Sequence, residues 1–264
     1  MTSNLSGRTA LVTGAAGSLG GAVCRALTAA QARVFLVDVN EAALQQSVAA
    51  LRRGGAEVAC CVADATSAAD VQRAMDQCAG WSEGALDILV NVAGGAGSRT
   101  VRHIEEIDEQ DWDAVLALNL KGTFLFSRAA VPLMRARGFG RIVNFSSTLA
   151  YGKKGPITTT GCRLAYATSK AALFGFTAQL AKDVAMHGIT VNALVLPLVL
   201  GAPGTRSRDR YDAMPATERE AWMADFPMGR PAYAEEVAAM VLFLAGEGSA
   251  YISGAALPVD GAFT

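Results

Sequence analysis

Short apolar runs alternate with longer segments of helical periodicity along almost the whole chain. The first run, Thr9–Thr13, predicts a strand, and after it apolar residues recur at the spacing of one helix face: Leu19, Ala22, Val23, Ala26, Leu27 and Ala30. Further runs predict strands at 34–37, 58–62, 88–92, 142–145 and 189–196, with helices at 41–53, 67–79, 109–136, 164–186 and 234–245. Because such alternation builds right-handed crossovers, we predict an α/β fold. Its doubly wound parallel sheet of about seven strands carries helices on both faces.

The chain shows no linker, repeat or low-complexity boundary, so we predict a single domain over residues 1–264. Two segments interrupt the alternation of strands and helices: residues 152–163, rich in Gly and Thr, and residues 198–227, rich in Pro, Arg and Asp. Long loops in compact folds are usually functional lids or else mobile filler, and we interpret 198–227 as a substrate lid. Pro258 places the final strand, 255–259, at an edge of the sheet.

Composition excludes several classes of function. Hydrophobic residues make up 52% of the chain, charged residues 18%, and the net charge is −1, so a large core is expected and a nucleic-acid partner is not. The two histidines and five cysteines follow no metal-ligand spacing, so no metal site is predicted. The longest apolar run, Val191–Leu200, has ten residues and contains a proline, which is too short to cross a bilayer. A cytoplasmic protein without a membrane partner is expected.

A glycine-rich turn, Thr13–Gly20, links the first strand to the first helix. Glycines at this point allow a pyrophosphate to approach the main-chain N–H groups at a helix N-terminus. Glycine also serves ordinary tight turns, but after the first strand of an alternating chain the turn favours dinucleotide binding. The predicted contacts are Gly14, Gly17, Ser18, Leu19 and Gly20.

Asp38 follows the second strand, 24 residues beyond Gly14. A carboxylate there accepts hydrogen bonds from the adenosine ribose hydroxyls and repels a 2′-phosphate. No Arg or Lys occupies position 17 or 39 to bind that phosphate, so we predict NAD rather than NADP as the cofactor. Asp38 could instead cap the next helix, but Asn40 is better placed for that role.

Tyr166 and Lys170 stand four residues apart on a predicted helix, so their polar ends lie on one face and can converge on one pocket. A nearby cation favours the phenolate, and it is expected to lower the pKa of the tyrosine from its ordinary value near ~10. On spacing alone, an amphipathic tyrosine beside a solvated lysine is the commoner arrangement. The glycine-rich turn and Asp38 in the same chain favour a proton-transfer pair instead.

Further motifs stand in a fixed order along the chain: Asn91-Val92-Ala93-Gly94, Asn119, Ser146-Ser147 and Val259-Asp260-Gly261. Together with the features above, they resemble the short-chain dehydrogenase/reductase family over essentially the whole length, which implies a Rossmann-type fold. The resemblance implies a catalytic tetrad of Asn119, Ser147, Tyr166 and Lys170. It also implies that the cofactor contacts, besides Tyr166 and Lys170, include Val39, Asp64, Ala65, Asn91, Ala93, Gly94, Pro197 and Val199.

By this resemblance, Tyr166 passes a proton to or from the substrate oxygen while hydride moves to or from the nicotinamide. Ser147 holds the same oxygen. Lys170 stabilises the tyrosinate and binds the nicotinamide ribose, and Asn119 anchors a water that connects Lys170 to solvent. Two plainer alternatives are Asn119 as a helix-kinking residue satisfied by backbone groups and Ser147 as a strand-end cap.

The chain departs from the family pattern at three places. Ser18 stands where most relatives carry a glycine; its Cβ narrows the approach of the pyrophosphate, although its hydroxyl could donate to a phosphate. The catalytic tyrosine follows the serine by 19 residues, more than is usual in the family. Residues 152–163 therefore resemble an insertion beside the substrate pocket, or else a surface bulge. The third departure is the Pro-Gly pair that normally follows the sixth strand in relatives. This chain lacks the pair: Pro197 is displaced by one residue and is followed by Leu198. Thr205 is a candidate for the threonine that relatives carry in the lid.

The leading hypothesis is an NAD-dependent oxidoreductase that transfers hydride between nicotinamide and a secondary alcohol or ketone, with Tyr166 as general acid and base. One alternative is an enzyme similar to 3-oxoacyl-carrier-protein reductases. Such enzymes generally use NADPH, which Asp38 disfavours, and they need a basic entrance for the acidic carrier. Arginines near the expected mouth of the site could supply that entrance: Arg99, Arg102, Arg206, Arg208 and Arg210. Another alternative is an NAD(H)-binding regulator with little catalysis.

The resemblance also implies a homotetramer or homodimer, because family members commonly pair through the helices expected at 109–136 and 164–186. Leu173, Phe174 and Phe176 supply apolar surface for such contacts, or else belong to the core. In the lid, a set of apolar side chains indicates a cover over a hydrophobic small-molecule substrate: Tyr211, Met214, Trp222, Met223 and Phe226.

Overall fold

Seven parallel strands form the central sheet of the protein. A computed structural model describes residues 4–97, 104–152 and 163–264. The strands of the sheet are β1 (Thr9–Thr13), β2 (Arg33–Asp38), β3 (Val58–Val62), β4 (Ile88–Asn91), β5 (Gly140–Ser147), β6 (Ile189–Leu196) and β9 (Ala256–Pro258). They lie in the order β3-β2-β1-β4-β5-β6-β9, and every neighbouring pair is parallel. The predicted Rossmann-type α/β fold is confirmed.

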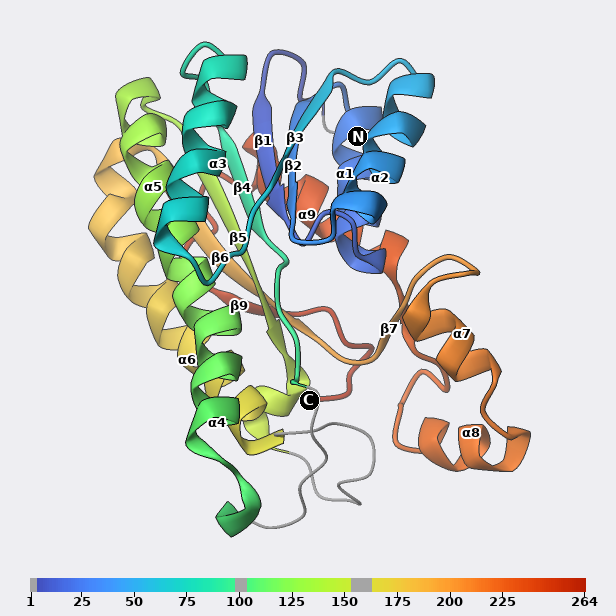
Figure 1. Ribbon diagram of the computed structural model, residues 1–264. Helices are drawn as coiled ribbons and strands as arrows, with labels where there is room; N and C mark the ends of the chain where they lie inside the picture. Colours follow the sequence, from blue (N-terminus) through green and yellow to red (C-terminus); the bar gives the residue numbers. More distant parts are fainter. Residues whose placement is uncertain (1–3, 98–103, 153–162) are drawn as a thin grey trace.

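Helices cover both faces of this sheet (Figure 1). One face carries α1 (Ser18–Ala29), α2 (Glu41–Arg53) and α9 (Ala234–Ala245), and the other carries α3 (Ala68–Trp81), α5 (Gly122–Arg137) and α6 (Arg163–Val184). In β1, Ala10 and Val12 belong to the core under the first group, and Leu11 belongs to the core under the second. A strand covered on both sides needs apolar residues at every position, which is why the strand runs do not alternate.

Side-chain caps fix where two of the helices begin. Asn40 accepts a hydrogen bond from the Ala43 N–H at 3.1 Å before α2, and Ser67 accepts one from the Asp70 N–H at 3.2 Å before α3. Such caps satisfy N–H groups that have no partner within the helix. Asn40 thus takes the capping role expected for it.

The helix predicted at 109–136 is one helical stretch in three parts: α4 (Glu109–Leu116), a π-helical turn (Ala117–Lys121) and α5. By length and composition the stretch Glu109–Arg137 could span a membrane, but half of its most apolar window is buried inside the protein. It packs against α3, α6 and β5. This is how the core helix of a globular domain packs.

The predicted lid projects from one side of the sheet (Figure 1). Residues 198–227 contain β7 (Val199–Leu200), α7 (Arg206–Asp212) and α8 (Ala216–Met223). β7 pairs with β8 (Ala232–Tyr233), so the two ends of the projecting segment are held together. In the central sheet, β9 is an edge strand in which Pro258 pairs with Val195, as the sequence predicts.

A buried carboxylate holds the edge of the sheet at which the strands begin. Asp87 precedes β4 and has no solvent exposure, and Arg8 and Arg137 each place a guanidinium nitrogen 3.1 Å from its Oδ1. The Thr9 N–H donates to its other oxygen at 2.9 Å. Both carboxylate oxygens are thus hydrogen-bonded, as a buried charge requires.

We expect Asp87→Asn to lower the free energy of unfolding by roughly 3 kcal/mol, because two guanidinium groups lose a buried counter-charge. Chemical denaturation at constant pH measures the loss. The matched control is Asp212→Asn, which breaks the exposed 2.7 Å pair with Arg208 and should change stability by less than about 1 kcal/mol. Equal effects of the two substitutions would contradict the role assigned to Asp87.

Candidate active site

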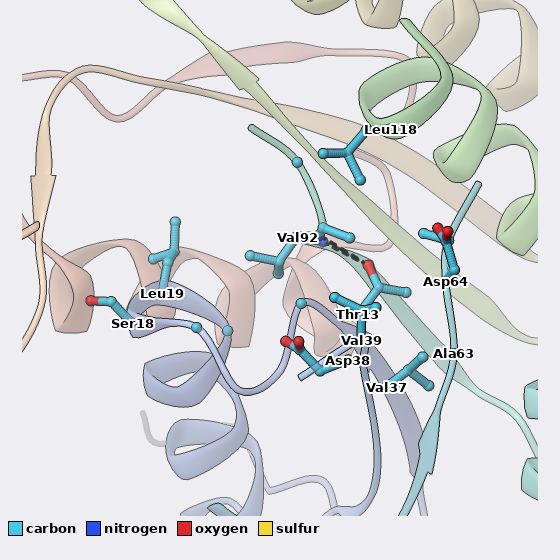
Figure 2. Close-up of a pocket in the computed structure, with 16 residues that line it drawn as sticks. Thr13, Ser18, Leu19, Val37, Asp38, Val39, Ala63, Asp64, Val92 and Leu118 are labelled. Carbon is cyan, nitrogen blue, oxygen red and sulfur yellow. Dashed lines mark hydrogen bonds between the residues drawn. The ribbon is translucent and has the colours of Figure 1, made fainter. Parts of the chain in front are cut away.

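A cavity of about 440 Å³ opens where the carboxyl ends of the first four strands meet the first turn of α1 (Figure 2). Doubly wound parallel sheets bind ligands at this edge. The cavity is lined by most of the predicted cofactor contacts: Gly14, Gly17, Ser18, Leu19, Gly20, Asp38, Val39, Asp64, Ala65, Ala93 and Gly94. Motifs that are far apart in the sequence therefore meet in one cavity.

The glycine-rich turn packs closely on its own backbone and on the loop that follows β4. Gly14 has a φ of +64°, which L side chains rarely adopt, and a Cβ on it would lie 2.9 Å from the Ala93 nitrogen. A Cβ on Gly20 would overlap the Gly14 carbonyl. Gly17 caps α1 without a side-chain hydrogen bond, so the first N–H groups of the helix remain available to a ligand. This arrangement fits a pyrophosphate.

Asp38 joins the turn to the rim of the cavity. Its Oδ2 accepts a hydrogen bond from the Ala16 N–H at 3.0 Å, and its Oδ1 accepts one from the Asn40 N–H at 2.9 Å. The carboxylate therefore fixes the glycine-rich turn as well as lining the cavity (Figure 2). A carboxylate at this rim suits ribose hydroxyls as hydrogen-bond donors.

Asn91 is the predicted cofactor contact whose side chain the structure places elsewhere. It is buried, and its Nδ2 donates to Asn144 Oδ1 at 2.9 Å and to Ser127 Oγ at 3.3 Å. Asn144 in turn donates to Thr177 Oγ1 at 3.0 Å. The last residue of β4 directs its side chain toward the helices that cover the sheet, so Asn91 ties β4 and β5 to α5 and α6.

The cavity is also lined by residues that were not among the predicted contacts: Thr13, Val37, Ala63, Val92 and Leu118. Thr13 and Val92 lie within the predicted motifs, and the other three each neighbour a predicted site residue in the sequence. Thr13 also has a structural role, because its Oγ1 accepts hydrogen bonds from the Val92 and Ala93 N–H groups, each at 3.1 Å. These bonds hold the loop after β4 against the end of β1 (Figure 2).

A smaller cavity of about 190 Å³ adjoins the first. The two share three lining residues, Leu19, Val92 and Gly94. The smaller cavity is lined by further residues that the sequence assigns to the site: Ser147, Tyr166, Lys170, Pro197 and Val199. Three of the four predicted catalytic residues therefore line a space that is next to the predicted cofactor site.

Two residues of β5 bind Lys170, one at its main-chain carbonyl and one at its side-chain ammonium group. The Ser146 hydroxyl donates to the main-chain carbonyl of Lys170 at 2.8 Å, and Lys170 Nζ donates to the Phe145 carbonyl at 2.7 Å. Nζ lies 5.6 Å from the centroid of the Tyr166 ring, and only 5% of Lys170 is exposed. The four-residue spacing on α6 thus brings both side chains to one pocket, and the alternative of a solvated lysine is wrong.

Burial sets the protonation of this pair. It raises the pKa of Tyr166, and the hydrogen bond with the Ser147 side chain acts in the opposite direction. The expected lowering of the Tyr166 pKa by a nearby cation is not found, because burial has the largest effect on it. Burial also lowers the pKa of Lys170 to about 8. Both shifts favour the neutral forms of the two groups.

Ser147 caps the end of a strand, as the plainer alternative predicts, and it also lines the smaller cavity. Its Oγ accepts a hydrogen bond from the Leu149 N–H at 3.2 Å, so the serine caps the turn that follows β5. The same side chain hydrogen-bonds Tyr166. The cap fixes the hydroxyl at the mouth of β5, beside the tyrosine.

Asn119 lies fully buried in the π-helical turn. Its Nδ2 donates to the Gly95 carbonyl at 2.8 Å and to the Val115 carbonyl at 2.9 Å, and its Oδ1 accepts from the Gly95 N–H at 3.1 Å. It is therefore satisfied by backbone groups, as the plainer alternative predicts, and it also reaches the site. A Cβ on Gly94 would lie 2.6 Å from Asn119 Oδ1 and 3.1 Å from Lys170 Nζ, so these two polar ends flank one glycine.

Part of the predicted site lies outside the described residues, namely 153–162 of the predicted insertion, Arg99 and Arg102. Among the arginines expected at the mouth of the site, Arg208 pairs with Asp212 at 2.7 Å.

Within the part of the chain that the structure describes, no group of three or more His, Cys, Asp or Glu side chains could hold a metal ion.

Known proteins resemble this chain over nearly its whole length. A family model described as enoyl-(acyl carrier protein) reductase matches residues 14–264. D-threitol dehydrogenase of Mycolicibacterium smegmatis is 38% identical, over 98% of this chain and 94% of the relative. Galactitol 2-dehydrogenase (L-tagatose-forming) of Cereibacter sphaeroides is 37% identical, over 98% and 96%. The crystal structure of NAD+-bound xylitol dehydrogenase matches with a TM-score of 0.85 at 29% identity, over 97% of this chain and 99% of that chain.

These likenesses agree with the geometry of the two cavities. The relatives are dehydrogenases of alcohols, and members of their family bind nicotinamide cofactors. The chain belongs to the short-chain dehydrogenase/reductase family of oxidoreductases.

Proposed function

We propose that the protein is an NAD-dependent oxidoreductase that transfers hydride between nicotinamide and a secondary alcohol or the corresponding ketone. One observation carries the proposal: the cavity lined by Ser147, Tyr166 and Lys170 shares three lining residues with the cavity built by the glycine-rich turn. The turn would hold the pyrophosphate, Asp38 the adenosine ribose, and Lys170 the nicotinamide ribose. When bound, the nicotinamide supplies the hydride acceptor or donor.

The side chains of the protein would supply the proton chemistry. Because burial raises the pKa of Tyr166, the phenol is protonated at neutral pH and is able to donate its proton to a ketone oxygen. Ser147, which is hydrogen-bonded to Tyr166, would hold that oxygen in place. Alcohol oxidation needs the reverse transfer. Lys170, with a pKa of about 8, is the neighbouring group whose protonation changes at mildly alkaline pH.

The preference for NAD rests on Asp38. Its carboxylate lines the cavity and is held by two backbone N–H groups, so it cannot turn away from a ribose without losing both bonds. A 2′-phosphate would meet this negative charge. The next residue, Val39, is 69% exposed at the same rim and offers the phosphate no hydrogen-bond donor from its side chain.

The substrate is proposed to be a small molecule with a secondary hydroxyl or ketone group. Two lid residues expected to cover a hydrophobic substrate, Met223 and Phe226, are buried, and the Phe226 ring lies 4.9 Å from that of Phe263. Relatives named for D-threitol and galactitol favour a polyol instead. A second candidate, reduction of an acyl-carrier-protein thioester substrate, is supported by the description of the matching family model.

A homodimer or homotetramer that pairs through α5 and α6 is proposed from the family resemblance. Leu173, which was a candidate for this surface, is fully buried and belongs to the core. Phe174 packs against Tyr151, with the two ring centroids 5.4 Å apart and the rings tilted by 37°. Phe124 on α5 and Leu164 on α6 are 42% and 45% exposed and remain available to a partner.

Burial of the Lys170 ammonium group should lower the free energy of unfolding at pH values where the group is charged. The folded state holds its pKa near 8 against 10.5 for the ordinary side chain, so between these values the unfolded chain binds more protons than the folded one. Stability must therefore rise with pH across this window. The difference between the two pKa values corresponds to about 3 kcal/mol.

We expect Tyr166→Phe to reduce turnover by roughly 10²–10⁴-fold while NADH binding stays within about threefold of wild type, because only the proton donor is lost. Absorbance of NADH measures turnover on xylitol, D-threitol, galactitol and a panel of apolar secondary alcohols and ketones. Fluorescence titration measures binding. Substantial activity in the variant would refute the assigned mechanism, and turnover only of an acyl-carrier-protein thioester substrate would favour the second candidate.

We expect Asp38→Asn to reduce the preference for NADH over NADPH by about tenfold or more, because the charge that repels a 2′-phosphate is removed. The ratio of kcat/KM for the two cofactors measures it. Asp64→Asn is the matched control: it removes a carboxylate from the same cavity, and it should change both cofactors alike. A wild-type enzyme that prefers NADPH would refute the role of Asp38.

We expect the stability of wild type relative to Lys170→Met to rise by roughly 2–3 kcal/mol between pH 7 and pH 10, because only the wild type loses a buried charge in this range. Denaturation of both proteins by urea at each pH gives the difference, in which the titration of other groups cancels. A difference independent of pH would show that the Lys170 ammonium is not destabilised by burial.

A further inference from the structure

The base of the lid rests directly on the glycine-rich turn. Strand β7 contacts α1, and the residue that follows β7 is Gly201, which is buried. A Cβ built on Gly201 would overlap Ser18 Oγ and would lie only 2.9 Å from Ser18 Cβ. In Figure 2 the Ser18 hydroxyl points away from Asp38 and toward the side on which the pale orange strand lies.

Rotation of the Ser18 hydroxyl would not make room for a side chain at position 201. The rotation would clear Oγ, but the Ser18 Cβ is fixed by its own backbone and would still be closer than ordinary carbon contacts allow. Thr205 Oγ1, at 2.8 Å from the same point, belongs to a side chain that could turn away by giving up its hydrogen bond to the Ala202 carbonyl. The contact with Ser18 is therefore the one that requires the two chain segments to separate.

The segment that carries Gly201 is tied in place from several sides. β7 pairs with β8, and just before β8 the Arg230 guanidinium binds the Glu236 carboxylate at 2.7 and 2.9 Å. The Gly201 N–H points at Ser207 Oγ, 3.4 Å away. Since this segment cannot easily withdraw, part of any displacement must fall on Ser18.

Ser18 lines the larger cavity, and Leu19 beside it lines both cavities. We propose that Gly201 is a positioning residue for the cofactor. By lacking a side chain, it lets the base of the lid seat against Ser18, and so fixes the first turn of α1 in the place where the pyrophosphate binds. The inference rests on the proposed function, in which this cavity holds a nicotinamide dinucleotide. It also accounts for a serine at a position where a glycine was expected, because the space that Ser18 needs is supplied by Gly201.

The test is a double-mutant cycle read by NADH binding. Gly201→Ala should raise the Kd for NADH by roughly tenfold or more, with kcat at saturating NADH within about threefold of wild type. Ser18→Gly in the same chain should remove this effect, so that Ser18→Gly and the double variant bind NADH within about twofold of each other. Gly80→Ala is the control for an added methyl group, since nothing lies within 4 Å of its Cβ position on α3.

Additive effects of the two substitutions, or an unchanged Kd in Gly201→Ala, would overturn the proposal. If Gly201→Ala alone fails to fold, the comparison of Ser18→Gly with the double variant still decides: similar NADH affinity supports the pairing, and a tenfold weaker double variant overturns it. Wild-type protein that binds neither NADH nor NADPH would instead refute the proposed function. The two failures are therefore distinguishable.

Discussion

Every strand of the central sheet runs in the same direction, and the site depends on this constraint. Parallel strands bring all their carboxyl ends to one edge, so side chains from distant parts of the sequence meet there: Gly14 after β1, Asp38 at the end of β2, Asp64 after β3, Gly94 after β4 and Ser147 at the end of β5. The opposite edge carries the Asp87 ion pairs. Stabilising charges and reactive groups are thus separated by the length of the strands.

At the reactive edge, missing side chains shape the site as much as the side chains present. A Cβ on Gly14, Gly20 or Gly94 would collide with backbone or with the polar ends of Asn119 and Lys170. These glycines let main-chain groups approach a ligand, and they let two polar side chains approach a loop. Substitutions at Gly14 and Gly94 would disturb the site directly, because the nearest atoms belong to Ala93, Asn119 and Lys170, which line or flank the two cavities.

The fold was predictable because strands that are buried on both faces leave apolar runs in the sequence. The N-termini of helices also carry capping residues such as Asn40. The positions of the site residues followed from the strand ends. The orientation and environment of side chains did not: Asn91 turns toward Asn144 and away from the cavity, and the pKa of Tyr166 is raised where a lowering was expected. Spacing gives neither the direction of a side chain nor its distance from solvent. Gly201 carried no signal at all, since its role exists only through a contact with a residue 183 positions earlier.

Burial of Tyr166 and Lys170 favours the neutral forms of both groups, yet the proposed reaction requires a charge to appear on one of them in each cycle. In a low-dielectric site such a charge is tolerated only where polar groups already point at it. Here the Ser147 hydroxyl is fixed by the Leu149 N–H, and the Phe145 carbonyl already accepts a hydrogen bond from Nζ. The same contacts satisfy the resting state and stand ready for the charged one, so little reorganisation is needed. A surface tyrosine and lysine at the same spacing would lack such pre-oriented polar groups, and water would have to reorient around the new charge.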